Sequence, residues 1–96
     1  MPYIKPEDKP VYAGGIQELA DAFASVGATG GDLNYVLTKV TLAWLMYHQP
    51  PYNYELRSAA YKELLCAAEE FYWRVIRPYE DKKIALNGDV YPREVL

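Results

Sequence analysis

The sequence predicts an all-α protein, a small helical bundle of three main helices plus a short C-terminal helix, and we expect it to be oligomeric. Apolar residues recur every three or four positions from Tyr61 to Tyr79, which is one face of a helix. The stretch from Leu33 to Tyr47 carries one charged residue, Lys39, so a helix there is apolar on more than one side. Because a chain this short has few residues with which to cover such a helix, the pattern favours self-association.

Composition narrows the possible functions. The 96 residues form one domain, and 51% of them are hydrophobic, which is typical of a folded protein. A net charge of −3 argues against nucleic-acid binding, which needs a wide basic surface. One cysteine, Cys66, cannot form an internal disulfide, and the sequence has no membrane-spanning or signal-like apolar run, so we expect a cytoplasmic protein with no membrane contact. Cys66 itself is expected to be a small core residue.

The first 14 residues are expected to form an extended arm. Pro2, Pro6 and Pro10 are spaced every fourth position, which disfavours a regular helix. Within the single domain 1–96, this arm (1–14) would precede a helical body (15–88) and a C-terminal tail (89–96). The arm could dock on its own subunit or on a neighbour.

Two helices are expected to follow the arm. The first is short, carries its apolar stripe on Ile16 to Ala24, and ends at Gly27. Thr29 and Asp32 resemble a capping box at the start of the second, which we favour over an anion cradle formed by the two intervening glycines. Pro50-Pro51 ends this second helix.

The third helix is expected to run from Tyr54 to Arg77, with Asn53 as its N-cap. Pro78 then either kinks it or begins a new short helix, Pro78 to Leu86. Asn87-Gly88 is the expected stop, since this pair readily takes the left-handed conformation.

Two blocks of the sequence resemble a known family. GDLNYVLTKV (31–40) and EEFYWRVIRPYEDKKIALNGDVY (69–91) are similar to blocks in a family of short bacterial and phage proteins of unknown function. Trp73 stands where that family often has a second basic residue beside Arg74, and this chain continues for residues 92–96 beyond the block. The resemblance implies a shared fold and, by analogy, a small accessory protein of bacterial or phage origin.

The second block also holds the candidate binding residues. Arg74 and Arg77 are three positions apart on one helix, and guanidinium groups grip phosphate or carboxylate while aromatic rings stack on a base. This pattern favours an anionic, nucleotide-like ligand, although both arginines could instead pair with Glu70 and Asp81. The full candidate set is Arg74, Arg77, Trp73, Tyr79 and Lys82.

Other residues of the two blocks are assigned structural roles. A buried Asn34 needs hydrogen-bond partners, and we expect it to bond the Asn-Gly-Asp-Val-Tyr turn and lock the blocks together. The structural set is Thr29, Asp32, Asn34, Tyr35, Asn87, Gly88, Asp89 and Tyr91.

We expect no enzymatic activity, metal or cofactor. Cys66 and the lone His48 lie on different helices without a catalytic signature or further ligands around them, and the acids after residue 68 are interleaved with basic residues. The expected function is that of a non-enzymatic accessory protein whose partners are itself and a small anionic ligand. The alternative is a protein–protein interaction module that acts on a host or phage protein.

Overall fold

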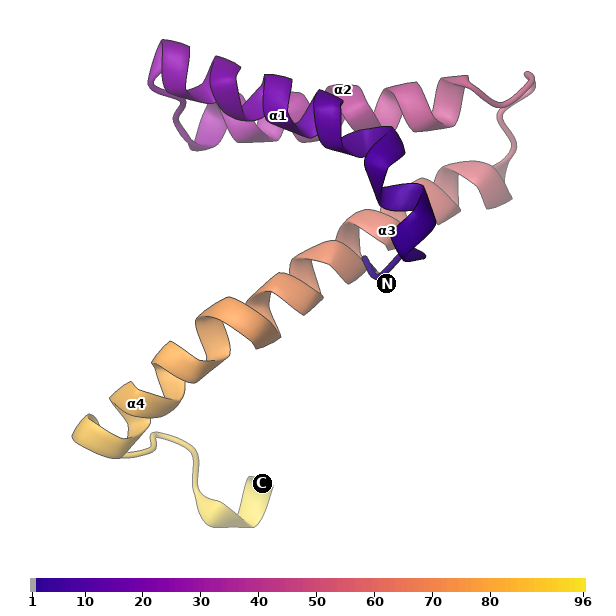
Figure 1. The fold of residues 1–96 in the computed structure, drawn as a ribbon. Coiled ribbons are helices and arrows are strands. Elements are labelled where there is room, and N and C mark those ends of the chain that lie inside the picture. The colour runs from indigo at the N-terminus through magenta and orange to yellow at the C-terminus, as the bar shows by residue number, and fades with distance from the viewer. Residues whose placement is uncertain (1) are drawn as a thin grey trace.

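The computed structural model describes residues 2–96, and within this range the chain is all-α, with no strand (Figure 1). Its helices are α1 (Lys9–Val26), α2 (Gly30–Met46), α3 (Tyr54–Phe71) and α4 (Arg77–Asn87), and the π-helical segment Tyr72–Ile76 joins α3 to α4. Single 3₁₀ turns lie at Pro6–Asp8 and Arg93–Val95. The predicted helical fold of three main helices and a short C-terminal one is confirmed.

Helix α1 begins earlier than the sequence pattern indicated, so the predicted extended arm is wrong for residues 9–14. Pro10 lies in the first turn of α1, where a missing backbone N–H leaves no hydrogen bond unmade. Pro6 similarly opens the 3₁₀ turn, and the backbone of Lys5 is extended. The two glycines, Gly14 and Gly15, continue the helix.

The predicted stops and caps at the next boundaries are confirmed. Gly27 ends α1 in the left-handed conformation, at φ 63° and ψ 58°. The Asp32 carboxylate accepts the Thr29 backbone N–H at 2.7 Å and the Thr29 hydroxyl at 3.0 Å, at the N-terminus of α2. Asn53 caps α3 by accepting the backbone N–H of Leu56 at 2.9 Å.

Helices α3 and α4 form one continuous rod through the π-helical segment (Figure 1). In this segment the Arg77 backbone N–H bonds the Tyr72 carbonyl, five residues back, instead of the carbonyl four residues back. The wider turn comes just before Pro78, whose ring would otherwise meet the Arg74 carbonyl. The rod ends where Gly88 takes φ 90° and ψ 149°, a region open to glycine alone.

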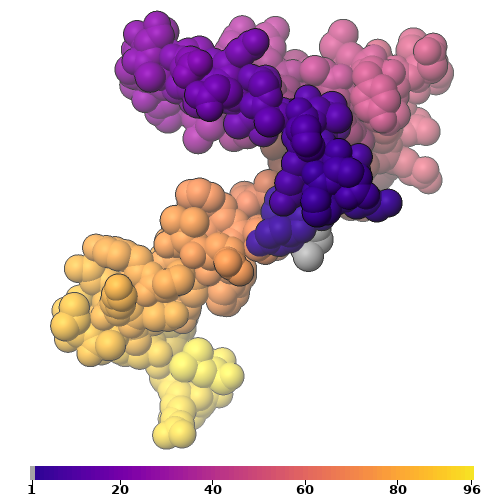
Figure 2. All heavy atoms as spheres, in the orientation of Figure 1, coloured from indigo at the N-terminus to yellow at the C-terminus, as the bar shows by residue number. Residues whose placement is uncertain are grey.

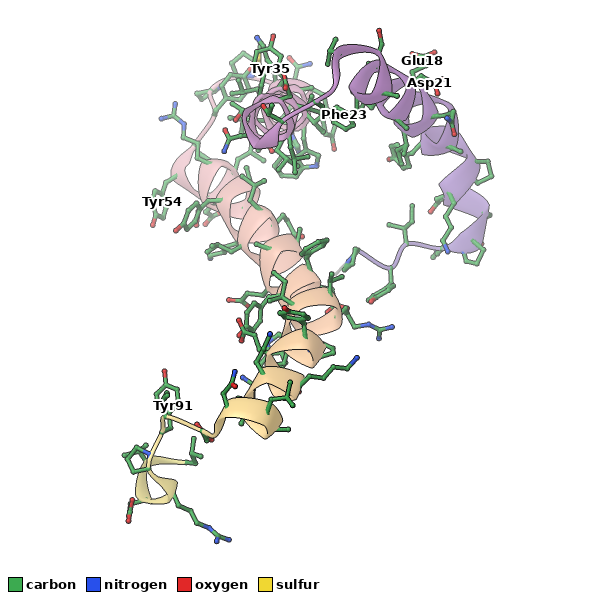
Figure 3. All side chains as sticks on the ribbon, turned by 90° about the vertical axis from the view of Figure 1, so that its left-hand side faces the viewer. Glu18, Asp21, Phe23, Tyr35, Tyr54 and Tyr91 are labelled. Atoms are coloured by element: carbon green, nitrogen blue, oxygen red, sulfur yellow. The ribbon has the colours of Figure 1, made fainter. Side chains whose placement is uncertain are left out.

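The helices are splayed rather than closely packed. Among elements separated by a loop, α2 and α3 make the main contact, and Figure 3 shows the N-terminal part of α1 lying well away from α2. The radius of gyration is 18.0 Å, whereas a compact domain of this length has about 12.5 Å. Figure 2 shows the same open shape, with a rod that extends well away from the α1 and α2 lobe.

This openness leaves almost no core within residues 2–96, where Ala60 alone is buried. Cys66, expected in the core, is exposed. The reason is that the apolar faces of α1, α2 and the rod do not close on one another. In the same part of the chain, no helix combines the length and apolar character needed to cross a membrane.

Candidate functional site

The predicted binding residues lie on the rod, around the π-helical segment. Trp73 and Arg74 belong to that segment, while Arg77, Tyr79 and Lys82 belong to α4. The structure therefore brings them to one stretch of helix, but it gives them different neighbours.

Arg77 is held within the rod. Its Nε lies 2.8 Å from Asp81 Oδ1, and its guanidinium lies over the Trp73 ring at 5.9 Å from the centroid. A hydrogen bond with the Tyr72 hydroxyl, and next the Asp81 carboxylate, raise the pKa of Arg77. The sequence left open whether Arg77 binds an anionic ligand or pairs with Asp81, and the structure shows the pair with Asp81.

Tyr72 extends the same network. Its hydroxyl donates to Glu80 Oε2 at 2.5 Å, and this bond is the main cause of a raised pKa for Tyr72. Arg77, Tyr72, Glu80 and Asp81 thus form a chain of charge-assisted contacts along two turns of helix. The positive charge of Arg77 is already compensated before any ligand arrives.

The remaining candidates face other neighbours. Lys83 lies over the Tyr79 ring at 5.5 Å from its centroid. The pKa of Tyr3 is raised, first by its hydrogen bond to Glu70, while the nearby charge of Arg74 acts in the opposite direction. Tyr3 donates its hydroxyl to Glu70 at 2.5 Å, so the pairing of Glu70 and Arg74 expected from their spacing gives way to a Tyr3 contact. Lys82 is exposed.

A groove of about 860 Å³ runs between α4 and the C-terminal tail. Arg77 and Lys83 line one wall, and the turn from Asn87 to Tyr91 lines the other. The Asp89 carboxylate accepts the Tyr91 backbone N–H at 2.9 Å, which fixes that turn. Asn87 and Gly88 end the rod, and together with Asp89 and Tyr91 they also line the groove.

The other structural candidates lie on α2. A hydrogen bond from the Thr29 backbone, and next one from its hydroxyl, lower the pKa of Asp32. Tyr35 is exposed, with Lys39 over its ring at 5.9 Å from the centroid. Asn34 cannot lock the two sequence blocks together in one chain, because the rod carries the Asn87–Tyr91 turn far from α2 (Figures 1 and 3).

Sequence reasoning missed a second feature, which we call the apolar opening. It consists of two adjoining hollows of about 530 and 800 Å³ that share Trp44 and lie between α1, α2, α3 and the N-terminal residues. Each helix contributes residues at helical i, i+3, i+4, i+7 spacing. The α1 members are Lys9, Tyr12, Ala13, Ile16, Gln17 and Ala20; the α2 members are Leu37, Val40, Thr41 and Trp44; the α3 members are Ala60, Glu63, Leu64 and Ala67.

The signal for this opening was present in the sequence. The stripe from Ile16 to Ala24 and the stretch from Leu33 to Tyr47 were recognised as apolar, but which helix faces converge depends on how the helices cross, and this is not a local property.

Comparisons with known proteins give one family. No curated protein and no solved structure matches the chain. A family described as a domain of unknown function (DUF6899) matches residues 1–90, which is nearly the whole chain. On the strength of that match, this protein belongs to the DUF6899 family.

Proposed function

We propose that this protein is a small non-enzymatic accessory protein of bacterial or phage origin, which works as a homo-oligomer and binds a protein partner. The observation that carries the proposal is the exposure of its apolar residues: among residues 2–96 only Ala60 is buried. Contiguous apolar surface on this scale is a mark of interaction sites.

Tyrosine usage supports binding to a protein. Eight of the ten tyrosines are exposed, at Tyr3, Tyr12, Tyr35, Tyr47, Tyr54, Tyr61, Tyr79 and Tyr91. Tyrosine combines a large apolar ring with a hydroxyl that tolerates water, so it is enriched in protein interfaces. Tyrosine therefore suits a surface that is exposed to solvent in the free protein and buried in the complex.

The electrostatics of the rod support binding rather than catalysis. Arg77 is paired with Asp81, and Glu80 accepts the Tyr72 hydroxyl, so these groups satisfy one another. A catalytic acid or base needs a proton that it can exchange with a substrate. A self-satisfied network instead stiffens the helix that carries it.

A second candidate is the capture of an anionic, nucleotide-like small molecule. The specific observation in its favour is that Arg77 lies over Trp73 and, with Lys83, lines the groove beside the Asn87–Tyr91 turn. Such a ligand would have to share the guanidinium with Asp81, which already compensates the charge of Arg77, and this makes the candidate the weaker one.

Native mass spectrometry of the protein purified from cells that make it tests both candidates. A bare multimer of the 11.0 kDa chain is the expected result. A multimer with a few hundred extra daltons per subunit would favour the ligand, and a monomer at every concentration would reject the oligomeric proposal.

A double variant separates the two binding roles. Arg74→Ala with Arg77→Ala should abolish retention of an anionic ligand, whereas docking of a protein partner through exposed tyrosines such as Tyr3 should persist. Arg57→Ala with Lys62→Ala, which removes the same charge from α3, is the matched control.

A further inference from the structure

We propose that the apolar opening is the place where a second copy of this chain docks, in a two-fold dimer centred on Trp44. This inference rests on the proposed function, since it names the partner and the surface for self-association. It also explains the apolar stripes of α1, α2 and α3, which a single chain does not bury.

The apolar stripes of α1, α2 and α3 have the spacing of helix faces that are normally buried in a hydrophobic core, but here they are exposed. The α2 and α3 stripes line one hollow, the α1 stripe lines the other, and Trp44 lines both. Nevertheless Ile16 is 64% exposed, Val40 54% and Trp44 39%. Helices bury such stripes against other helices in folded proteins, so the opening lacks an apolar occupant.

The area left uncovered is enough for a stable dimer. The chain has an accessible surface of 8642 Å², whereas a compact monomer of its mass exposes about 5,600 Å². The excess is therefore about 3,000 Å² for the whole chain, of which the opening is one part, and obligate dimers bury roughly 2,000–5,000 Å² in total. Partial burial of the excess on both chains reaches that range.

The chemistry of the opening favours a second copy over other occupants. Charged side chains contribute little to its lining: Lys9 and Glu63 are the charged members. A net charge of −3 works against docking on an anionic membrane. The C-terminal tail is no candidate from the same chain, because it lines the groove beside α4 at the far end of the rod.

A second copy carries the complementary surface by definition. In a two-fold interface the same patch serves both subunits, so the stripes around one Trp44 meet the stripes around the other. Trp44 lines both hollows and is therefore the natural centre of the contact. Large aromatic residues near the centre of an interface commonly dominate its binding energy.

The two tryptophans allow a direct test of this placement. Trp73→Phe leaves Trp44 as the fluorescent reporter, and Trp44→Phe leaves Trp73, which is 62% exposed on the rod. Acrylamide quenching is measured across a dilution series whose subunit count is determined by sedimentation equilibrium. The quenching constant of Trp44 should fall about twofold or more on assembly, because an interface core excludes water, while that of Trp73 changes little.

A matched pair of substitutions on α2 gives a second test. Trp44→Ala should raise the dimer dissociation constant about 30-fold or more, as expected for a central interface residue. Leu42→Ala is the control, because Leu42 is 43% exposed and lies roughly 200° round the helix from Trp44. It should change the constant only a few-fold, and circular dichroism checks that both variants remain helical.

The outcomes separate this inference from the proposed function. A dimer that survives Trp44→Ala, or in which Trp44 quenches like Trp73, overturns the placement and leaves the oligomeric proposal standing. A monomer at every concentration in sedimentation overturns both. A fall in Trp44 quenching together with loss of the dimer in Trp44→Ala supports both.

Discussion

The Tyr3 hydroxyl and the Glu70 carboxylate are 67 positions apart in the sequence, and their hydrogen bond is the longest-range polar contact described in residues 2–96. It fastens the extended N-terminal residues to the end of α3, close to the charge of Arg74. The N-terminal residues thereby form one edge of the apolar opening, to which Pro2 and Ile4 contribute.

An alkaline titration of the tyrosines tests the hydrogen bond between Tyr3 and Glu70. The bond to Glu70 is the first cause that raises the pKa of Tyr3 above 10.0. A group whose pKa is raised on folding contributes stability that is fully present below its pKa in the unfolded chain. The contribution of Tyr3 therefore persists up to about pH 10. It is lost as the pH rises through the raised pKa that Tyr3 has in the folded protein. Tyr3→Phe should remove one ionisation from the alkaline end of the tyrosine absorbance titration.

Tyr72→Phe provides an independent comparison for that titration. The pKa of Tyr72 is raised by its bond to Glu80, within the rod. Each single variant should remove one late ionisation and the double variant both. An unchanged alkaline end in Tyr3→Phe would mean that the N-terminal residues do not rest on α3 in solution.

At the scale of the element, the rod is a helix that has adjusted to a proline. Pro78 removes a backbone donor, and the i to i+5 bond from Arg77 to Tyr72 widens the preceding turn. The adjustment also sets how Trp73 and Arg77 face each other, with the guanidinium 5.9 Å from the ring centroid.

Replacing the proline should therefore stabilise the helix. Pro78→Ala restores the donor and allows regular i to i−4 bonding, and we expect the midpoint of thermal unfolding to rise by roughly 4–8 °C, as for a gain of about 1 kcal/mol in a domain of this size. Circular dichroism melting at fixed protein concentration is the measurement. Pro10→Ala, in the first turn of α1 where no donor is needed, should leave the midpoint nearly unchanged. A lower midpoint for Pro78→Ala would indicate that assembly depends on the π-helical turn.

Element boundaries show what a sequence can and cannot predict here. Gly27, the Thr29–Asp32 pair and Asn53 were predicted correctly because each cap depends on residues within one turn of helix. Gly88 was predicted correctly as the end of the rod, but its ψ of 149° lies outside the left-handed conformation that was expected there. The start of α1 was missed because Pro10 is compatible with both an arm and a first turn, and the spacing of the prolines does not decide between them.

The candidate site was predicted less completely, for a physical reason. The position of Arg77 beside Trp73 followed from helical spacing, and so did its alternative partner Asp81. The exposure of Cys66 and the convergence of three stripes around Trp44 depend on helix crossing, which no short pattern contains.

At the scale of the whole molecule, the association that we propose is apolar, so salt should affect it weakly. The dissociation constant is expected to change less than about threefold between roughly 0.05 and 0.5 M NaCl, because screening acts on exposed charges and the stripes carry few. Sedimentation equilibrium at both salt concentrations is the measurement. A tenfold change would instead place the interface on the charged rod.

The near absence of buried side chains in residues 2–96 has a consequence for the protein inside a cell. If the two-fold dimer forms the core, folding and assembly become one concentration-dependent equilibrium, and stability grows with the amount of protein present. Chains made at a low level would stay open to proteases, whereas chains above the dissociation constant would protect one another. Synthesis rate would then act as a threshold, so that the functional form accumulates only after enough copies have been made.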